Sequence, residues 1–502
     1  MNFRTAILIF IILSSIKHVY GETFTDGTFT FRVIAESECE IIGCQTPPNP
    51  LIIPSTTTNN GNIYVITSIG MDAFCACKEL TGNLIIPNTV VSIGANAFTG
   101  IKFSGELVVP YSVKYIGRGA FQKTQFTKIT LNASTATIYA TTFKDCTSLE
   151  TLILGDSIKS IGEWVQGPSD SYYDFPGGTF EGCYNLKNIT FGENISTIGR
   201  ATFKGCTGLS GKLVLPKSVK VIEDWAFSEC KGLTGPLELP DNVTTIGSFA
   251  FSYCSNIIGP LELPNSVTYI GSSVFTSCTN INGHLKLPDS VTTVEDYAFW
   301  GTNITGVTFP KSLQHLGHTP FPCDIISGIL TIPASLISMR YSFENCTKIT
   351  EVLFEPNSQI QSIIGAFKSC TQLTKVTISG NTKKYTVSGG AFAHCPNLTS
   401  VTLEGSICAI NDTTFKASNN IRYLKLGNGD SQLKIGRDVF DICAIDTLHL
   451  GVTLTPDSWK FLDISTLKAL TLGGGVSAVK DGDFAGCTGL KSLILEPNGY
   501  RL

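Results

Sequence analysis

The chain has 502 residues and a formal net charge of −4, with 42% hydrophobic and 15% charged residues. It contains no run of basic residues, so it lacks the electrostatic footprint that nucleic-acid binding requires. After the N-terminal segment, no apolar stretch reaches the roughly 18 residues that a transmembrane helix needs, so we expect no transmembrane segment.

Residues 1–21 have the features of a signal peptide. Arg4 gives the segment a basic start, and residues 6–16 form an apolar run that is too short to span a membrane. The small residue Gly21 precedes the expected cleavage site before Glu22. The sequence therefore predicts an exported chain, either secreted or located at the extracellular cell surface.

Residues 22–64 differ in pattern from everything that follows. Residues 28–33 alternate like a β-strand, and residues 45–50 are a proline-rich loop. Because the first coil of a repeat array needs a cover over its open end, we expect an N-terminal cap. Cys39 and Cys44 lie in this segment and are the candidate disulfide pair of an exported chain.

A repeat of 22–25 residues occupies residues 65–502, and a phenylalanine marks each copy. In one copy, Leu237-Glu238-Leu239 alternates like a strand, and a proline then ends it. The apolar residues of one copy cannot enclose themselves, so the copies must stack and share one continuous core. The markers indicate about 18 coils: Phe74, Phe98, Phe121, Phe143, Phe180, Phe203, Phe227, Phe251, Phe275, Phe299, Phe321, Phe343, Phe367, Phe392, Phe415, Phe440, Phe461 and Phe484.

The repeat resembles the BspA-like, or Treponema-type, leucine-rich repeat. Residues 237–254 read Leu-x-Leu-Pro-x-x-Val-x-x-Ile-Gly-x-x-Ala-Phe-x-x-Cys, which is the pattern of that family. The resemblance implies a β-rich leucine-rich-repeat solenoid, whose stacked coils form a curved parallel sheet. It also implies an adhesin that binds proteins of host or neighbouring cells, including the extracellular matrix. Our hypothesis for the partner is a protein or a glycan of such cells.

One insertion, residues 163–178, interrupts the repeat. An insertion in a solenoid loops outward, and aromatic side chains on a projecting loop are good anchors for a partner. The same rings could instead fold back onto the solenoid. The candidate anchors are Trp164, Tyr172, Tyr173 and Phe175.

Of the 17 cysteines, 12 lie three residues after a marker phenylalanine. Their Cβ bonds should run parallel in stacked coils, which is the wrong geometry for a disulfide, so we expect buried thiols. A linear ladder of thiols does not converge on a zinc ion either. The twelve are Cys77, Cys146, Cys183, Cys206, Cys230, Cys254, Cys278, Cys346, Cys370, Cys395, Cys443 and Cys487.

No catalytic motif is assembled by spacing, so we expect neither enzymatic activity nor a cofactor. His315 and His318 have metal-like spacing but lack a convincing set of further ligands. Glu238 and Glu262 occupy equivalent outward positions on consecutive copies and could form an acid pair, as in a polysaccharide-active parallel β-helix. The interpretation as surface charge is preferred, because Lys286 follows in the same column.

The outward positions of the strands define a face that could bind a partner. The first half of this face is β-branched and low in charge, which is typical of an interaction surface. A self-assembling coat protein, joined end to end, is a further alternative. The candidate binding residues of the face are Ile85, Val108, Ile153, Val214, Glu238, Glu262 and Lys286.

Asn-x-Ser/Thr sequences predict glycosylation sites for a chain exported by a glycosylating host. The eight candidates are Asn132, Asn188, Asn194, Asn242, Asn303, Asn345, Asn397 and Asn411.

Overall fold

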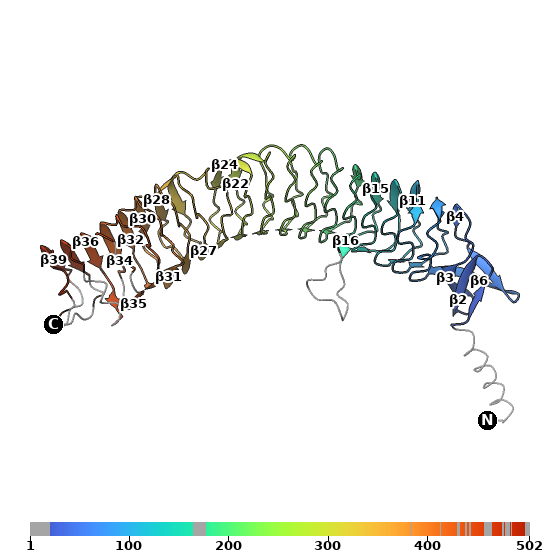
Figure 1. The fold of residues 1–502 in the computed structure, drawn as a ribbon, viewed down its shortest axis with the longest axis horizontal. Coiled ribbons are helices and arrows are strands. Elements are labelled where there is room, and N and C mark those ends of the chain that lie inside the picture. The colour runs from blue at the N-terminus through green and yellow to red at the C-terminus, as the bar shows by residue number, and fades with distance from the viewer. Residues whose placement is uncertain are drawn as a thin grey trace, which may run out of the picture. The chain divides into compact units, whose positions relative to one another are not determined.

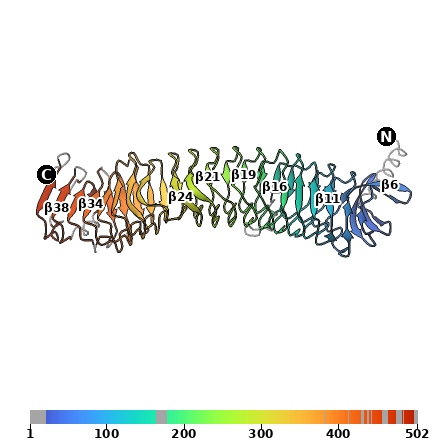
Figure 2. The ribbon, with the colours of Figure 1, turned by 90° about the horizontal axis from the view of Figure 1, so that it is seen from above.

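The computed structural model describes residues 21–163, 177–381, 383–411, 413–428, 432–436, 439–440, 443–455, 464–473, 476, 482 and 484–496. The chain divides into two compact units, Met1–Ile258 and Gly259–Leu502. In each unit the chain winds through stacked coils, and the described residues contain β-strands and turns but no α-helix (Figure 1, Figure 2). The expected β-rich leucine-rich-repeat solenoid is confirmed.

The first unit begins with antiparallel strands that the later coils lack. Three of them form a meander and two form a hairpin: β1 (Thr23–Thr25), β2 (Phe29–Ala35) and β3 (Glu38–Cys44), then β5 (Thr56–Asn59) and β6 (Asn62–Ile69). Strand β3 also pairs in parallel with β6, which starts the solenoid's pairing pattern. Phe29 packs edge-on against Phe74, the first marker ring, with the centroids 6.1 Å apart. The N-terminal segment therefore covers the first ring of the core.

Parallel ladders of long and short strands run through the coils of the first unit. The long-strand ladder contains β4 (Leu51–Ile52), which pairs with β8 (Leu84–Ile85), and then β11 (Glu106–Val109), β13 (Lys128–Leu131), β15 (Thr151–Leu154) and β17 (Asn188–Thr190). A minor pair joins β7 (Thr81–Gly82) and β10 (Lys102–Phe103). The short strands form two ladders. The first continues from β6 through β9 (Ser92–Ile93) and β12 (Tyr115–Ile116), and the second contains β14 (Thr137–Tyr139), β16 (Ser160–Glu163), β18 (Thr197–Ile198), β19 (Val221–Ile222) and β20 (Thr245–Ile246).

The second unit repeats the arrangement. Its long strands are β22 (Asn282–Lys286), β24 (Asn303–Thr308), β26 (Gly328–Ile332), β28 (Ile349–Phe354), β30 (Lys375–Ile378), β32 (Ser400–Leu403), β34 (Tyr423–Leu426), β36 (Thr447–Leu450), β38 (Ala469–Leu472) and β39 (Ser492–Leu495). Its short strands are β21 (Tyr269–Ile270), β23 (Thr293–Val294), β25 (His315–Leu316), β27 (Ser338–Arg340), β29 (Ser362–Ile364), β31 (Tyr385–Ser388), β33 (Ile407–Ile410), β35 (Gln432–Ile435) and β37 (Thr453–Leu454).

The marker phenylalanines stack into a column inside each unit. In the first unit, Phe203, Phe227 and Phe251 are completely buried and lie 5.4 Å apart from centroid to centroid. Offset-stacked rings at this distance add to the free energy gained from burying their area. Because one ring sits between two others, each coil completes its core only through its neighbours.

The cysteine ladder runs beside the ring column. The thiol of Cys230 donates a hydrogen bond to the carbonyl oxygen of Phe203, the marker of the preceding coil, over 3.1 Å. Cys206 contacts Phe180 in the same way over 3.2 Å. These cysteines are therefore buried thiols that tie each coil to the one before it, as the sequence predicts.

The prediction is wrong for two members of the ladder. Cys77 forms a disulfide with Cys44, and Cys346 forms one with Cys323. In both bridges the partner lies outside the ladder register, so its Cβ does not have to run parallel to that of the ladder cysteine. Among the described residues, Cys77 and Cys346 are the only ladder members in disulfides.

The expected Cys39–Cys44 bridge is also wrong. The two residues are five apart on β3, and side chains at odd separations on a strand point to opposite faces. Cys39 points into the core and is completely buried as a thiol, whereas Cys44 lies where the strand meets the first repeat.

The strand expected at Leu237-Glu238-Leu239 does not form. On the long-strand side of this part of the first unit the coils are joined by isolated bridges, such as Gly211 with Leu233 and Gly235 with Ile257, whereas the short strands β18, β19 and β20 still pair. Gly235 is followed by Pro236, which has no N–H to donate to a ladder. The proline therefore interrupts the long-strand ladder between the better-formed coils.

Close approach of the coils explains the glycine that stands four residues before several markers, such as Gly247 before Phe251. A Cβ placed on Gly247 would lie 2.6 Å from the backbone nitrogen of Asp224 in the preceding coil. The turn around the ring also needs left-handed backbone on both sides, at Phe249 (φ 59°) and Tyr253 (φ 60°). Because only this arrangement brings the ring inward between two tight turns, the same pair of positions recurs from coil to coil.

Candidate functional site

An apolar strip runs across the outward side of the long-strand ladder in the first unit. Its members lie opposite one another in register, Ile52 with Ile85, Val108 with Thr130, and Thr130 with Ile153. Strand β8 lies beside β11, which joins the two groups. At the usual spacing of about 4.8 Å between strands, the strip is a continuous surface. We call these five residues, Ile52, Ile85, Val108, Thr130 and Ile153, the outward strip.

The aliphatic residues at one end of the outward strip are open to solvent. Ile52 and Ile85 are each 50% exposed and Val108 is 44% exposed, whereas Ile153 is half-buried. Neighbouring inward residues such as Leu107 are completely buried. The exposure is therefore set by the strand alternation and does not reflect loose packing.

Charged residues flank the outward strip in pairs. Glu106 and Lys128, on adjacent strands, form an ion pair of 2.8 Å, and Glu106 also accepts a hydrogen bond from the Thr130 hydroxyl over 3.2 Å. The hydrogen bond from Lys128 holds the pKa of the Glu106 carboxyl below its ordinary value. Glu150 and Lys187 form a second pair, of 3.0 Å. The charges beside the strip are thus already compensated.

Further along the first unit, the column of outward residues continues without a regular ladder. Val214 is 71% exposed, and Glu238 forms an ion pair with Lys212. This environment does not support a catalytic acid role for Glu238, because an exposed carboxylate in an ion pair is typical of ordinary surface charge.

In the second unit, two predicted residues line a common hollow. Glu262 and Lys286 lie around a depression of about 370 Å³ together with His284. The His284 ring is 2.7 Å from the Thr308 hydroxyl on β24. This hollow is polar and differs in character from the outward strip.

The aromatic residues of the insertion, Trp164, Tyr172, Tyr173 and Phe175, lie outside the described residues. The structure therefore does not test whether they contact a partner or the solenoid.

The eight sequon asparagines are all exposed. In four of them the side-chain amide also donates to a backbone carbonyl of the preceding coil, for example Asn242 to Lys217 over 2.8 Å. The other three pairs are Asn194 with Asp156, Asn303 with Thr279 and Asn397 with Thr371.

Sequence reasoning missed Ile52, which extends the outward strip into the N-terminal segment. The signal was present, since residues 51–54 read Leu-Ile-Ile-Pro, identical to residues 84–87. It also missed a hollow around Trp300, an exposed aromatic residue that directly follows the marker Phe299.

Two classes of site are not found in the part of the chain that the structure describes. There is no cluster of three or more histidine, cysteine or acidic side chains suited to a metal ion. None of the described segments is a helix of the length and apolar character needed to cross a membrane.

Comparison with protein families gives a match over most of the chain. The family described as BspA type Leucine rich repeat region matches six stretches, residues 67–166, 174–283, 210–324, 258–364, 282–388 and 385–501. No curated protein matches the chain.

Solved structures of bacterial repeat proteins are similar in fold. A leucine-rich repeat protein from Bacteroides ovatus is 21% identical, with 94% of each chain covered and a TM-score of 0.41. A leucine rich cell surface protein from Faecalibacterium prausnitzii is 19% identical over 93% of this chain and 97% of that one, with a TM-score of 0.28. The pneumococcal vaccine antigen PcpA is 15% identical over 95% of this chain and 99% of that one, with a TM-score of 0.35.

Proposed function

This chain belongs to the BspA-type leucine-rich-repeat family, and on that premise we propose that it is an extracellular scaffold that binds another protein. The proposed binding surface is the outward strip of the first unit. The partner is a protein of a host or neighbouring cell, or of the extracellular matrix, that presents a flat apolar patch.

The observation that carries the proposal is the exposed group of Ile52, Ile85 and Val108, in which Ile52 lies opposite Ile85 and strand β8 lies beside β11. Exposed aliphatic residues that lie singly need no explanation, but a contiguous patch usually marks an interaction surface. The compensated pairs Glu106–Lys128 and Glu150–Lys187 would form a polar rim around an apolar centre, as in other protein interfaces.

Two further features support an extracellular location. The Cys44–Cys77 and Cys323–Cys346 disulfides form and persist in oxidising compartments. The N-terminal sequence has the pattern of a signal peptide, although residues 1–20 lie outside the described part of the chain. Both agree with a secreted or cell-surface protein.

The outward strip is tested by placing charge on it. In the variant Ile85→Lys/Val108→Lys, two ammonium groups would have to be desolvated in the interface, so binding should weaken by about a hundredfold or more. Binding of the full chain is measured on immobilised fibronectin, laminin and collagen and on cultured epithelial cells.

The matched control is Ile329→Lys, because Ile329 is an outward, 63% exposed residue in the second unit. Thermal unfolding of both variants should match that of the unmodified chain. If Ile85→Lys/Val108→Lys binds every ligand as well as Ile329→Lys does, the outward strip is not the binding surface.

A further inference from the structure

The second unit has a hollow beside Trp300 that is lined by both aromatic and polar side chains, unlike the apolar outward strip of the first unit. It has a volume of about 530 Å³ and is lined by residues of three successive coils, which carry the markers Phe299, Phe321 and Phe343. The volume lies within the roughly 300–1,000 Å³ of typical small-ligand sites.

The hollow results from two short coils. The steps from Phe299 to Phe321 and on to Phe343 are 22 residues each, whereas the four steps from Phe203 to Phe299 are 24. Leu285 comes seven positions after Cys278. Its register partner Val307 comes only five positions after Thr302, which occupies the position equivalent to Cys278. The missing residues shorten the turn after Trp300 and leave space beside it.

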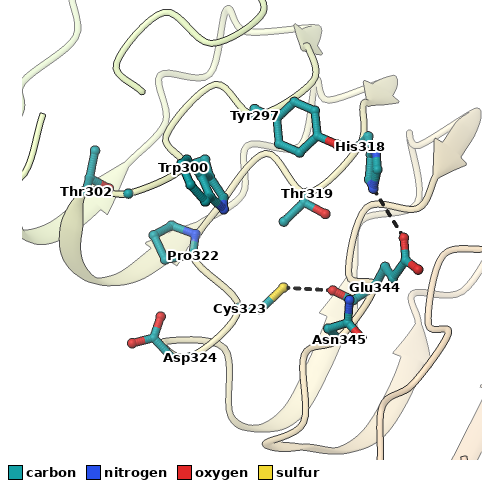
Figure 3. A pocket seen from close by; sticks show the side chains of 11 residues that line it. Tyr297, Trp300, Thr302, His318, Thr319, Pro322, Cys323, Asp324, Glu344 and Asn345 are labelled. Atoms are coloured by element: carbon teal, nitrogen blue, oxygen red, sulfur yellow. Dashed lines mark hydrogen bonds and ion pairs between the residues drawn. The ribbon is translucent and has the colours of Figure 1, made fainter. Parts of the chain in front are cut away.

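One wall of the hollow is aromatic. Trp300 is 50% exposed and Tyr297 is 37% exposed, and both line the hollow together with the ring of Pro322. Figure 3 shows Trp300 and Pro322 on one side and the His318–Glu344 pair on the other, with Thr319 between them. A flat ligand with an apolar face could therefore stack on the indole.

The opposite wall is a fixed chain of hydrogen bonds. Glu344 is bonded by Lys368 over 2.8 Å and lies 3.2 Å from Nε2 of His318. If the Nε2–H of a neutral His318 donates to the Glu344 carboxylate, Nδ1 is left to accept from the Tyr297 hydroxyl at 2.8 Å. These groups hold one another in place, and the charge of Glu344 is compensated by Lys368.

The remaining polar groups of the hollow suit a ligand rich in hydroxyl groups. Among the described residues, the exposed Asp324 carboxylate has no side-chain hydrogen bond or ion pair, and it can accept from hydroxyls. The Asn345 amide can donate and accept, and the Trp300 indole N–H can donate. The hollow thus offers both hydrogen-bond donors and acceptors around the aromatic face of Trp300.

We propose that this hollow is a saccharide-binding site for a neutral hexose or N-acetylhexosamine. A sugar ring has an apolar C–H face, which fits the indole, and a rim of hydroxyls, which fits Asp324 and Asn345. An anionic ligand is disfavoured by Asp324. A simple cation would use the aromatic ring and the carboxylate but leave the amide and indole donors without a role.

The test uses the full chain, prepared without N-glycosylation so that Asn345 is unmodified, and titrated calorimetrically with methyl glycosides. The probes are methyl β-galactoside, methyl α-mannoside and methyl β-N-acetylglucosaminide. At least one should bind, and Trp300→Ala should weaken it by about tenfold or more, through loss of the stacking surface. Asp324→Ala, at an exposed position, provides a second variant that does not disturb the core.

The matched control is Tyr253→Ala, because Tyr253 is also a 50% exposed aromatic residue on a loop beside a marker ring. It should bind the glycoside normally, as should Ile85→Lys/Val108→Lys, since the strand face is a separate surface. Fetuin, compared with enzymatically deglycosylated fetuin, shows whether the same sugar is captured on a glycoprotein.

Three results would overturn the proposal. They are no binding of any glycoside to the unmodified chain, binding that survives both Trp300→Ala and Asp324→Ala, and binding of tetramethylammonium in place of the glycosides.

Discussion

The ladder cysteines act through burial and a single hydrogen bond each, and both properties remove their reactivity. The Cys230 thiol is completely buried and donates to the carbonyl of Phe203. Burial raises the pKa of the Cys230 thiol well above its ordinary value, so little thiolate forms at neutral pH. The thiols therefore serve as small apolar groups with one weak donor.

Thiol labelling should separate the buried cysteines from the exposed one. With iodoacetamide at pH 8, Cys75, which is exposed, should be modified more than about tenfold faster than Cys206 or Cys230 in the folded chain. Peptide mass spectrometry after timed quenching measures each rate. Labelling in urea is the control, and equal rates in the folded chain would contradict the buried ladder.

His449 should make stability dependent on pH. Its burial, and then the charge of Lys425, lower the pKa of the His449 imidazole below the ordinary 6.5. The unfolded chain therefore binds the proton at a higher pH than the folded chain does, and the unfolding free energy should fall as the pH drops from above 6.5 toward the folded value, then level off.

The check is urea unfolding at pH 7.5 and 5.5 for the unmodified chain and for His449→Gln. The variant should lose less stability between the two pH values. His315→Gln is the control, because His315 lies exposed on β25. An unchanged pH dependence in His449→Gln would show that other groups dominate acid destabilisation.

Among the elements, the long-strand ladder of the first unit does not form at Leu237-Glu238-Leu239, which directly follows Pro236. Strands β11, β13 and β15 pair over four residues each, whereas the long-strand side of the coil with Pro236 is joined to its neighbours by isolated bridges. The backbone hydrogen bonding between long strands thus varies along the first unit, although the pattern of buried residues is the same from coil to coil.

Amide hydrogen exchange should reveal this difference. The amides of residues 237–239 should exchange at least about tenfold faster than those of residues 129–131, because the latter are held in a parallel ladder. Exchange followed by mass spectrometry of matched peptides gives both rates. Similar protection of the two segments would mean that the prolines do not interrupt the ladder in solution.

The repeat period was enough to predict the core but not the exceptions to it. A phenylalanine every 22–25 residues fixes which side chains stack, because each coil can be buried only by the next. The period does not show that Pro236 breaks a strand, because that depends on the pairing partner. It could not pair Cys44 with Cys77 either, since that bridge depends on how β3 meets the first coil.

Of the two candidate sites, the outward strip could be predicted from the sequence, whereas the hollow beside Trp300 could not. Strand alternation places Ile85, Val108 and Ile153 on one outward face, and the structure brings them together. The hollow beside Trp300 arises from residues that are missing from a turn. Such a shortening is visible in the sequence, but the space it leaves depends on three coils at once.

For the whole molecule, each unit is stabilised by contacts between successive coils, and the N-terminal strands close the first of them. Gly21 donates to the carbonyl of Val33, and Val33 donates to that of Glu22, so the backbone is already tied to β2 at the expected cleavage site. After cleavage before Glu22, the hydrogen bond that Val33 donates to Glu22 would remain, whereas the one that Gly21 donates would be lost.

The signal-peptide pattern of residues 1–21 predicts that the exported chain begins at Glu22. When the full gene is expressed in a secreting host, the mass of the released protein and its N-terminal peptide should correspond to residues 22–502. Retention of Met1, or cleavage within β2, would contradict the assignment of residues 1–21 as a signal peptide. A variant with Gly21→Arg should block cleavage, because the site requires a small residue.

The link from each thiol to the preceding phenylalanine carbonyl also bears on how such a protein changes over generations. In Cys206, Cys230 and Cys254 the thiol donates to the carbonyl oxygen of the marker phenylalanine of the preceding coil, over 3.1 to 3.2 Å. After a recombination event that deletes or duplicates one 24-residue copy, each thiol would still find an equivalent carbonyl acceptor, and each phenylalanine ring would still stack on an equivalent ring. Alleles with different numbers of copies should then fold equally well, so the length of the protein can change while the contacts in its core stay the same.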